Sequence, residues 1–110
     1  MKLVVAFIQD YDTDAVLRAL TSDGFRVTRI SGVGGFLHSA NTTLFVGAED
    51  DHVEHCLATI RRNSRAREES PVSAHDAATL GLTVGDITPV VVGGAVVLIL
   101  PISRFEQIRN

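Results

Sequence analysis

Apolar and polar residues follow two different periods along the chain, and these predict strands and helices in turn. Residues 3–8 are apolar at every position and rich in β-branched side chains, so we expect a strand covered on both faces. Residues 25–30 alternate with period two, and a third strand is expected over 42–48. Residues 90–100 predict two further strands folded back at a Gly-Gly pair, because such pairs favour the primed turns of hairpins.

Between these strands, apolar residues spaced by three and four predict two helices. The first is expected over 13–23, and Gly24 lies just past its end, where a left-handed cap is usual. The second is expected to open at the acidic residues 49–51. The residues expected to offer N-cap oxygens to the first helix are Asp10, Asp12 and Thr13. The buried stripe of the second helix is expected to comprise Val53, Cys56, Leu57 and Ile60.

The order of these elements is βαββαβ with one extra strand from the C-terminal hairpin, which predicts a single α+β domain over 1–110. Two helices on one face of an antiparallel sheet define the ferredoxin-like architecture. The other face is then uncovered and carries Arg26, Thr28 and many apolar residues, which favours self-association. Two long connections are expected: a Gly-rich loop at 31–41 and a mobile loop at about 63–88.

Composition and charge exclude several classes of protein. The 110 residues carry a net charge of −3, so no basic field exists to hold a nucleic-acid polymer. The single cysteine, Cys56, cannot form an internal disulfide, which fits a reducing compartment. The longest apolar run, 90–100, falls short of the ~20 residues that a membrane-spanning helix needs. We therefore expect a cytoplasmic protein without membrane insertion.

The motifs of common enzyme classes do not occur in the sequence. Cys56 falls on the buried stripe of the second helix, which excludes a Cys-His nucleophile, and no Ser-His-Asp arrangement is credible. The phosphate-loop pattern G-x-x-x-x-G-K-[ST] does not occur, because Lys2 is the only lysine. His52 and Cys56 have chelating spacing on a helix, but no third ligand accompanies them, so solvated histidines are the preferred interpretation. We therefore expect no catalytic residue, no metal and no cofactor.

One group of residues suits a ligand that contains phosphate. Arg26 and Thr28 share a strand face just before the Gly-rich loop, and a guanidinium, a hydroxyl and approachable backbone N–H groups together bind an oxyanion. Phe36 and Leu37 could cover a purine ring, and Asn41 offers the donor and acceptor that a base edge requires. The alternative is that Arg26 is a solvated strand residue and the glycines only form a hairpin loop.

Several longer strings of residues point to a known family. They are the opening 1–10, Arg26-Val27-Thr28, Gly34-Gly35-Phe36-Leu37, Asn41-Thr42-Thr43-Leu44, Val46-Gly47, Gly93-Gly94-Ala95, Leu100-Pro101 and Phe105-Glu106-Gln107. Together they resemble the bacterial cyclic di-AMP receptor family of PII-like signalling proteins. The resemblance covers nearly the whole chain except the long loop, and Gly-Gly-Phe-Leu followed by Asn-Thr-Thr is its most specific part.

This resemblance implies a homotrimer that binds three cyclic di-AMP molecules, one in each cleft between neighbouring subunits, without catalysis. It implies that Arg26 and Thr28 meet the phosphates and ribose, and that the backbone of Val27 and Gly47 lines the pocket. A ligand-dependent change in the loops would then regulate an unknown downstream protein. The residues that would enclose an adenine and close the site are Gly35, Phe36, Leu37, Asn41 and, from the C-terminal tail, Gln107.

Other functions stay open on the same scaffold, because a fold does not determine its ligand. The chain could be a PII-like sensor of ATP or another nucleotide, a ligand-free trimeric adaptor, or a metal-responsive trimer. Classical PII proteins would grip ATP with basic residues of the long loop, for which Arg65 and Arg67 are the only candidates here. The metal-responsive trimer has a poor set of ligands.

Overall fold

The structure is a computed structural model that describes residues 1–31, 41–65, 89–106 and 108. Within these residues it contains two α-helices, a short 3-10 helix and five strands, which confirms the α+β class. In chain order the elements are β1 (Lys2–Gln9), α1 (Asp10–Ser22), β2 (Arg26–Ser31), β3 (Asn41–Ala48), η1 (Asp50–His52), α2 (Val53–Asn63), β4 (Val90–Val92) and β5 (Ala95–Pro101).

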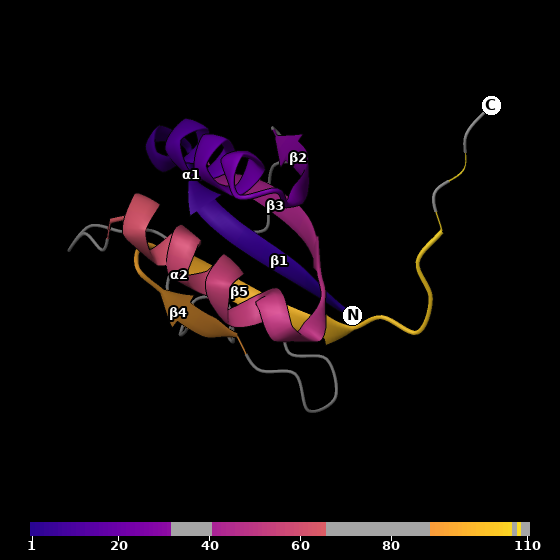
Figure 1. The fold of residues 1–110 in the computed structure, drawn as a ribbon. Coiled ribbons are helices and arrows are strands. Elements are labelled where there is room, and N and C mark those ends of the chain that lie inside the picture. The colour runs from indigo at the N-terminus through magenta and orange to yellow at the C-terminus, as the bar shows by residue number, and fades with distance from the viewer. Residues whose placement is uncertain (32–40, 66–88, 107, 109–110) are drawn as a thin grey trace.

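The five strands form one antiparallel sheet in the order β2-β3-β1-β5-β4 (Figure 1). β1 lies in the middle and pairs with both β3 and β5, which explains why residues 3–8 are apolar throughout. β4 is the extra strand and lies at the edge beside β5. The arrangement is consistent with a ferredoxin-like fold that carries one additional hairpin strand.

Both helices cover the same face of the sheet, and the main hydrophobic core lies between them and the strands (Figure 1). The stripe predicted for α2 is buried in this core, which confirms the spacing of three and four as its signal. From α1, Val16 and Leu20 reach the same core. The core side chains contributed by the sheet are Val4, Ala6, Ile8, Leu44, Val46, Ala48, Val92, Ala95 and Val97.

A second apolar cluster lies on the opposite face of the sheet. Its buried members are Val5, Phe7, Val96 and Leu98, with Leu3 and Leu100 packed against them. The buried members are at most 7% exposed in the single chain. The expectation of an uncovered apolar face is therefore wrong at this cluster. The large apolar side chains that this face does expose are Phe45 and Val91.

Helix α1 begins at Asp10, three residues earlier than predicted. The extended residue before it, Gln9, makes no side-chain capping bond. The predicted N-cap role of Asp10, Asp12 and Thr13 is therefore wrong. Thr13 lies inside the helix, where its hydroxyl donates a hydrogen bond to the Gln9 carbonyl at 3.1 Å. At the other end, Gly24 has φ +91°, as predicted for a left-handed residue past the helix.

The predicted loop boundaries need small corrections. Ser31 and Asn41, predicted as the ends of the Gly-rich loop, belong to β2 and β3, and Asn63 belongs to α2. Ser64 and Arg65 follow α2 as part of the predicted long connection, whereas residues 32–40 and 66–88 lie outside the described residues. The φ of +61° at Gly93 fits the primed turn predicted between the last two strands. Neither described helix is long and apolar enough to cross a membrane.

Candidate functional site

Arg26, the first residue of β2, lies on the sheet face away from the helices. Its neighbours Phe25 and Val27 pack against the main core, so strand alternation places Arg26 and Thr28 on the opposite face. Both side chains are exposed. Arg26 makes no hydrogen bond or ion pair with any residue that the structure describes. Its charge is therefore available to an anion.

The second arginine of β2 behaves differently. Arg29 lies on the helix side of the strand, and its Nη1 atom is 3.4 Å from Oδ1 of Asp14 in α1. The two arginines thus share one strand and similar exposure to solvent, but only Arg29 has a carboxylate partner. This contrast makes Arg29 a matched control for any role of Arg26.

Gly47 lies directly opposite Arg26 in the ladder between β2 and β3. A Cβ atom built at Gly47 would meet only the terminal methyl of Met1, at 4.0 Å. The sheet beside the guanidinium therefore carries no side chain at this position, and a ligand can approach the backbone closely. The structure thus brings Arg26 and Gly47 together, with Thr28 two residues further along β2.

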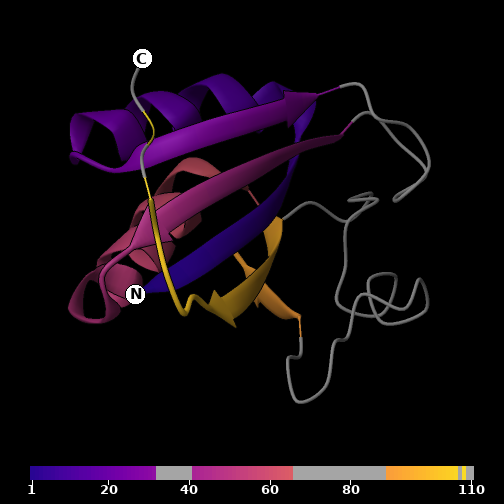
Figure 2. The ribbon, with the colours of Figure 1, turned by 90° about the vertical axis from the view of Figure 1, so that its right-hand side faces the viewer.

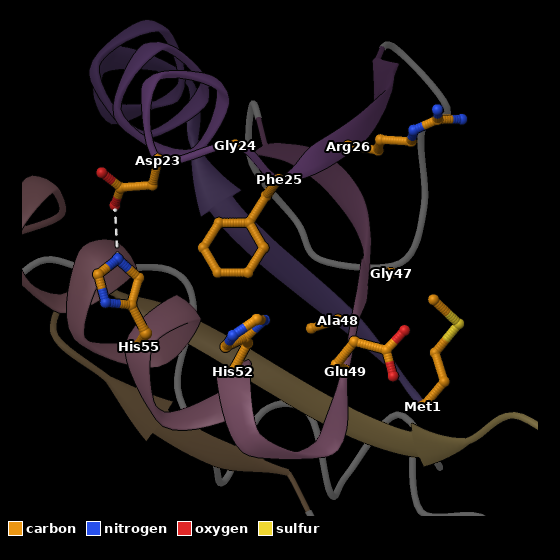
Figure 3. A pocket seen from close by; sticks show the side chains of 10 residues that line it. All are labelled: Met1, Asp23, Gly24, Phe25, Arg26, Gly47, Ala48, Glu49, His52 and His55. Carbon is orange, nitrogen blue, oxygen red and sulfur yellow. Dashed lines mark hydrogen bonds and ion pairs between the residues drawn. The ribbon is translucent and has the colours of Figure 1, made fainter.

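A cavity of about 430 Å³ adjoins this corner of the sheet (Figure 3). It lies where the connection from α1 to β2, the end of β3 and the beginning of α2 meet. Figure 3 shows the Phe25 ring pointing toward His52 inside the cavity, and the Arg26 guanidinium pointing away from both. The lining residues are Met1, Asp23, Gly24, Phe25, Arg26, Gly47, Ala48, Glu49, His52 and His55.

One wall of the cavity is a hydrogen-bonded link between the two helices. Oδ2 of Asp23, just past α1, accepts a hydrogen bond from Thr59 Oγ1 at 2.7 Å and lies 3.1 Å from His55 Nε2. Both bonds lower the pKa of the Asp23 carboxyl below its usual value of 3.8, and the bond from Thr59 has the larger effect. The His55 ring also lies beside Phe25, with ring centroids 5.8 Å apart.

The charges on the two sides of this corner differ in sign. Asp23 and Glu49 place carboxylates on the cavity wall, where they would repel a ligand with two phosphates. The Arg26 guanidinium points out of the cavity (Figure 3). The arrangement therefore suits a phosphate on the open sheet face beside Arg26, and disfavours one inside the cavity.

The other predicted site residues are spread along the sheet or lie outside the described residues. The Val27 side chain faces the core, so only its backbone can meet a ligand. Asn41 begins β3, and its backbone pairs with Gln9 at the opposite end of that strand from Gly47. At ~3.3 Å per residue, Asn41 and Gly47 are about 20 Å apart. The predicted site residues outside the described part are Gly35, Phe36, Leu37 and Gln107.

Sequence reasoning did not place His55 beside Asp23, because that contact joins residues more than 30 positions apart. The spacing of the two histidines on the second helix was the available signal. Cys56, weighed with them as a zinc ligand, lies in the core instead, and burial raises the pKa of its thiol to about 11. In the described part of the chain, no three His, Cys, Asp or Glu side chains are arranged to hold a metal ion.

The antiparallel sheet with two helices on one face makes this an α+β protein consistent with a ferredoxin-like fold, and its other face carries an arginine that has no partner among the described residues. The model of the Cyclic-di-AMP receptor family matches residues 1–108, and the chain belongs to this family. It is a family of binding proteins with a signalling role, not of enzymes. The family resemblance found in the sequence strings is thereby confirmed.

A solved structure agrees with this fold. The chain is similar to the crystal structure of a functionally unknown protein from Pediococcus pentosaceus, with a TM-score of 0.67 and 31% sequence identity. The similarity covers 97% of this chain and 96% of that one, so both share the whole architecture.

Proposed function

We propose that this chain is a non-enzymatic receptor for cyclic di-AMP that seats a phosphate of the ligand at Arg26 and Thr28, beside the bare backbone of Gly47. The protein works without a cofactor, in the cytoplasm, as a single domain over 1–110. Ligand binding changes the conformation of the chain and so regulates a downstream protein. Membership of the Cyclic-di-AMP receptor family supports the choice of ligand.

The observation that carries the proposal is the unpaired, exposed Arg26 opposite a residue without a side chain. A guanidinium binds phosphate through two parallel N–H···O bonds, which are short and charge-assisted. The adjacent Thr28 hydroxyl and the approachable backbone at Gly47 add polar partners on the same face. In an acidic chain, such a local seat is required to offset the two negative charges of the ligand.

The site is proposed to be complete only between subunits of a homotrimer. Arg26 and Gly47 lie at one end of the pair formed by β2 and β3, whereas Asn41 lies about 20 Å along β3 at the other end. Two neighbouring copies could bring opposite ends of this strand pair to one ligand. The exposed Phe45, between the two ends, offers apolar surface for such a contact. The residues proposed from the family resemblance to enclose the adenine and close the site are Gly35, Phe36, Leu37, Asn41 and Gln107.

Titration calorimetry with cyclic di-AMP, cyclic di-GMP and ATP tests the proposal. We expect saturable binding of cyclic di-AMP, with much weaker binding of the other two nucleotides. Stronger binding of ATP would favour a different nucleotide sensor, and no binding of any of the three would favour a ligand-free adaptor. Native mass spectrometry gives the oligomeric state, and a monomer in the presence of ligand would contradict the shared site.

The matched pair Arg26→Ala and Arg29→Ala tests the residue assignment. We expect Arg26→Ala to weaken cyclic di-AMP binding at least about tenfold, because a charge-assisted phosphate contact is lost. Arg29→Ala removes a positive charge from the same strand but on the face toward α1. The affinity of this variant for cyclic di-AMP should therefore stay within about twofold of the parent's. Equal losses in both variants would show that only net charge matters and would refute the seat at Arg26.

A further inference from the structure

Two aspartates in the first turn of α1 bind distant parts of the chain. Oδ1 of Asp10 accepts a hydrogen bond from the hydroxyl of Thr42 at 2.9 Å, and Oδ2 of Asp12 accepts one from the backbone N–H of Arg65 at 3.3 Å. Thr42 is the second residue of β3, and Arg65 follows the end of α2. One helical turn therefore contacts the beginning of a strand and the chain that leaves the other helix.

Both contacts involve groups for which a partner matters. Thr42 and Asp12 are buried residues, 0% and 6% exposed. Buried polar groups are almost always hydrogen-bonded, and losing a partner leaves them desolvated without compensation. The Thr42 hydroxyl has only Asp10 as its side-chain partner among the described residues, so this bond holds the first turn of α1 against β3.

The backbone at Arg65 is also held from its other side. A Cβ atom built at Gly94, in the turn between β4 and β5, would lie 2.0 Å from the Arg65 carbonyl oxygen. Next to it, Ser64 Oγ accepts a hydrogen bond from the Gly94 N–H at 3.2 Å. The chain leaving α2 thus lies between the first turn of α1 and the β4–β5 turn, and it is hydrogen-bonded to both.

The first turn of α1 has no side-chain cap of its own. Its N-cap residue Gln9 makes no capping bond. Uncapped first turns fray readily, so tertiary contacts decide the orientation of this one. Asp10 and Asp12 are two residues apart, about 3 Å along the helix axis, so one rigid turn carries both contacts. In Figure 2 the junction of β1 with α1 lies at the same side of the sheet as the beginning of β3.

We propose that the first turn of α1 is a mechanical link, in which Asp10 and Asp12 act as positioning residues that couple the beginning of β3, at Asn41 and Thr42, to the chain leaving α2, at Arg65. Loss of the bond between Thr42 and Asp10 frees the first turn, and the turn then no longer holds the Arg65 amide. Because Asn41 belongs to the proposed ligand site, a part of this inference rests on the proposed function: the link carries a ligand-induced shift at Asn41 to Arg65.

Thr42→Val tests the link without ligand, because valine has the shape of threonine but no hydroxyl. The readout is hydrogen exchange of the Arg65 amide by NMR, far from the substitution in sequence. We expect its exchange to become at least about tenfold faster, as the loss of a hydrogen bond to a charged group implies. Thr42→Ser keeps the hydroxyl and should restore the parent rate. Asp14→Asn, one turn further along α1 and bonded to Arg29, should leave the exchange rate unchanged.

An Arg65 amide that exchanges at the parent rate in Thr42→Val overturns the proposal. Asp10→Ala breaks the same bond from the exposed side and serves as the second variant if Thr42→Val does not fold. The ligand arm follows the Asn41 and Arg65 amide shifts during a titration with cyclic di-AMP. We expect both to shift in the parent, and only Asn41 to shift in Thr42→Val. If neither amide shifts in the parent, the proposed function is refuted. The exchange rates without ligand still show whether Thr42 and Arg65 are coupled through α1.

Discussion

Replacing Gly94 with alanine should destabilise the protein through a backbone clash. The new Cβ would lie 2.0 Å from the Arg65 carbonyl oxygen and 2.5 Å from its carbonyl carbon, whereas ordinary contacts begin at 3.4 Å. The turn between β4 and β5 would have to move away by more than an ångström. That movement would also lengthen the hydrogen bond from the Gly94 N–H to Ser64 Oγ.

The magnitude of this destabilisation follows from two contributions. Overpacking in a tightly packed region costs about 1–3 kcal/mol, and neither neighbour is a flexible side chain that could turn aside. The weakened hydrogen bond adds about 1 kcal/mol. Ser64 is itself fixed, because its hydroxyl donates to the Ile60 carbonyl at 2.7 Å. We therefore expect a loss of roughly 2–4 kcal/mol, which lowers Tm by about 8–16 °C in a domain of this size.

Urea denaturation and thermal melting followed by circular dichroism measure the effect. Gly47→Ala is the control, because its Cβ would reach only the Met1 methyl at 4.0 Å, and it should melt within about 2 °C of the parent. If Gly94→Ala also melted within about 2 °C of the parent, the β4–β5 turn could move away from Arg65 with little loss of stability. Ser64 and Arg65 would then not be tightly held against the β4–β5 turn.

Two further predictions concern the site and the link between the helices. Gly47→Ala should weaken cyclic di-AMP binding about tenfold while leaving Tm unchanged, because the new methyl group lies on the sheet surface beside Arg26, where the ligand is proposed to bind. An affinity equal to that of the parent, measured by calorimetry, would contradict this prediction. Asp23→Asn should lower the free energy of unfolding at neutral pH. The pKa of Asp23 is lower in the folded state than its usual value of 3.8. The parent is therefore more stable than Asp23→Asn by the full amount above pH 3.8, and this difference in the free energy of unfolding disappears as the pH falls through the folded-state pKa. Urea titrations from neutral pH to about pH 2 measure that advantage, and a difference independent of pH would refute the role of the carboxylate.

The elements that sequence analysis located correctly are those whose signal is local. The stripe of α2 repeats within two turns, and the strand over 3–8 is apolar at every position, so neither needs information about distant residues. The start of α1 was misplaced for the opposite reason. Asp10 and Asp12 have the chemistry of N-caps, but their carboxylates bind Thr42 and Arg65, which are 32 and 53 positions away.

The same distinction applies to the candidate site. Arg26 and Thr28 could be assigned to one face from strand alternation alone, and the structure places both there. The position of Gly47 opposite Arg26 depends on the register between β2 and β3, which no local pattern specifies. Only the family resemblance placed Gly47 in the site. The contact between Asp23 and Thr59 is likewise long-range and was not foreseen.

The distribution of partners explains why an acidic chain can still present a positive site. On the helix side, the Asp14 carboxylate is paired with the Arg29 guanidinium, so these two opposite charges offset each other there. A bonded carboxylate close to its cation contributes little field across the sheet. Arg26 lies on the other face, where strand alternation keeps it from the aspartates of α1. The charge that decides anion binding is thus the local one at Arg26, not the net charge of −3.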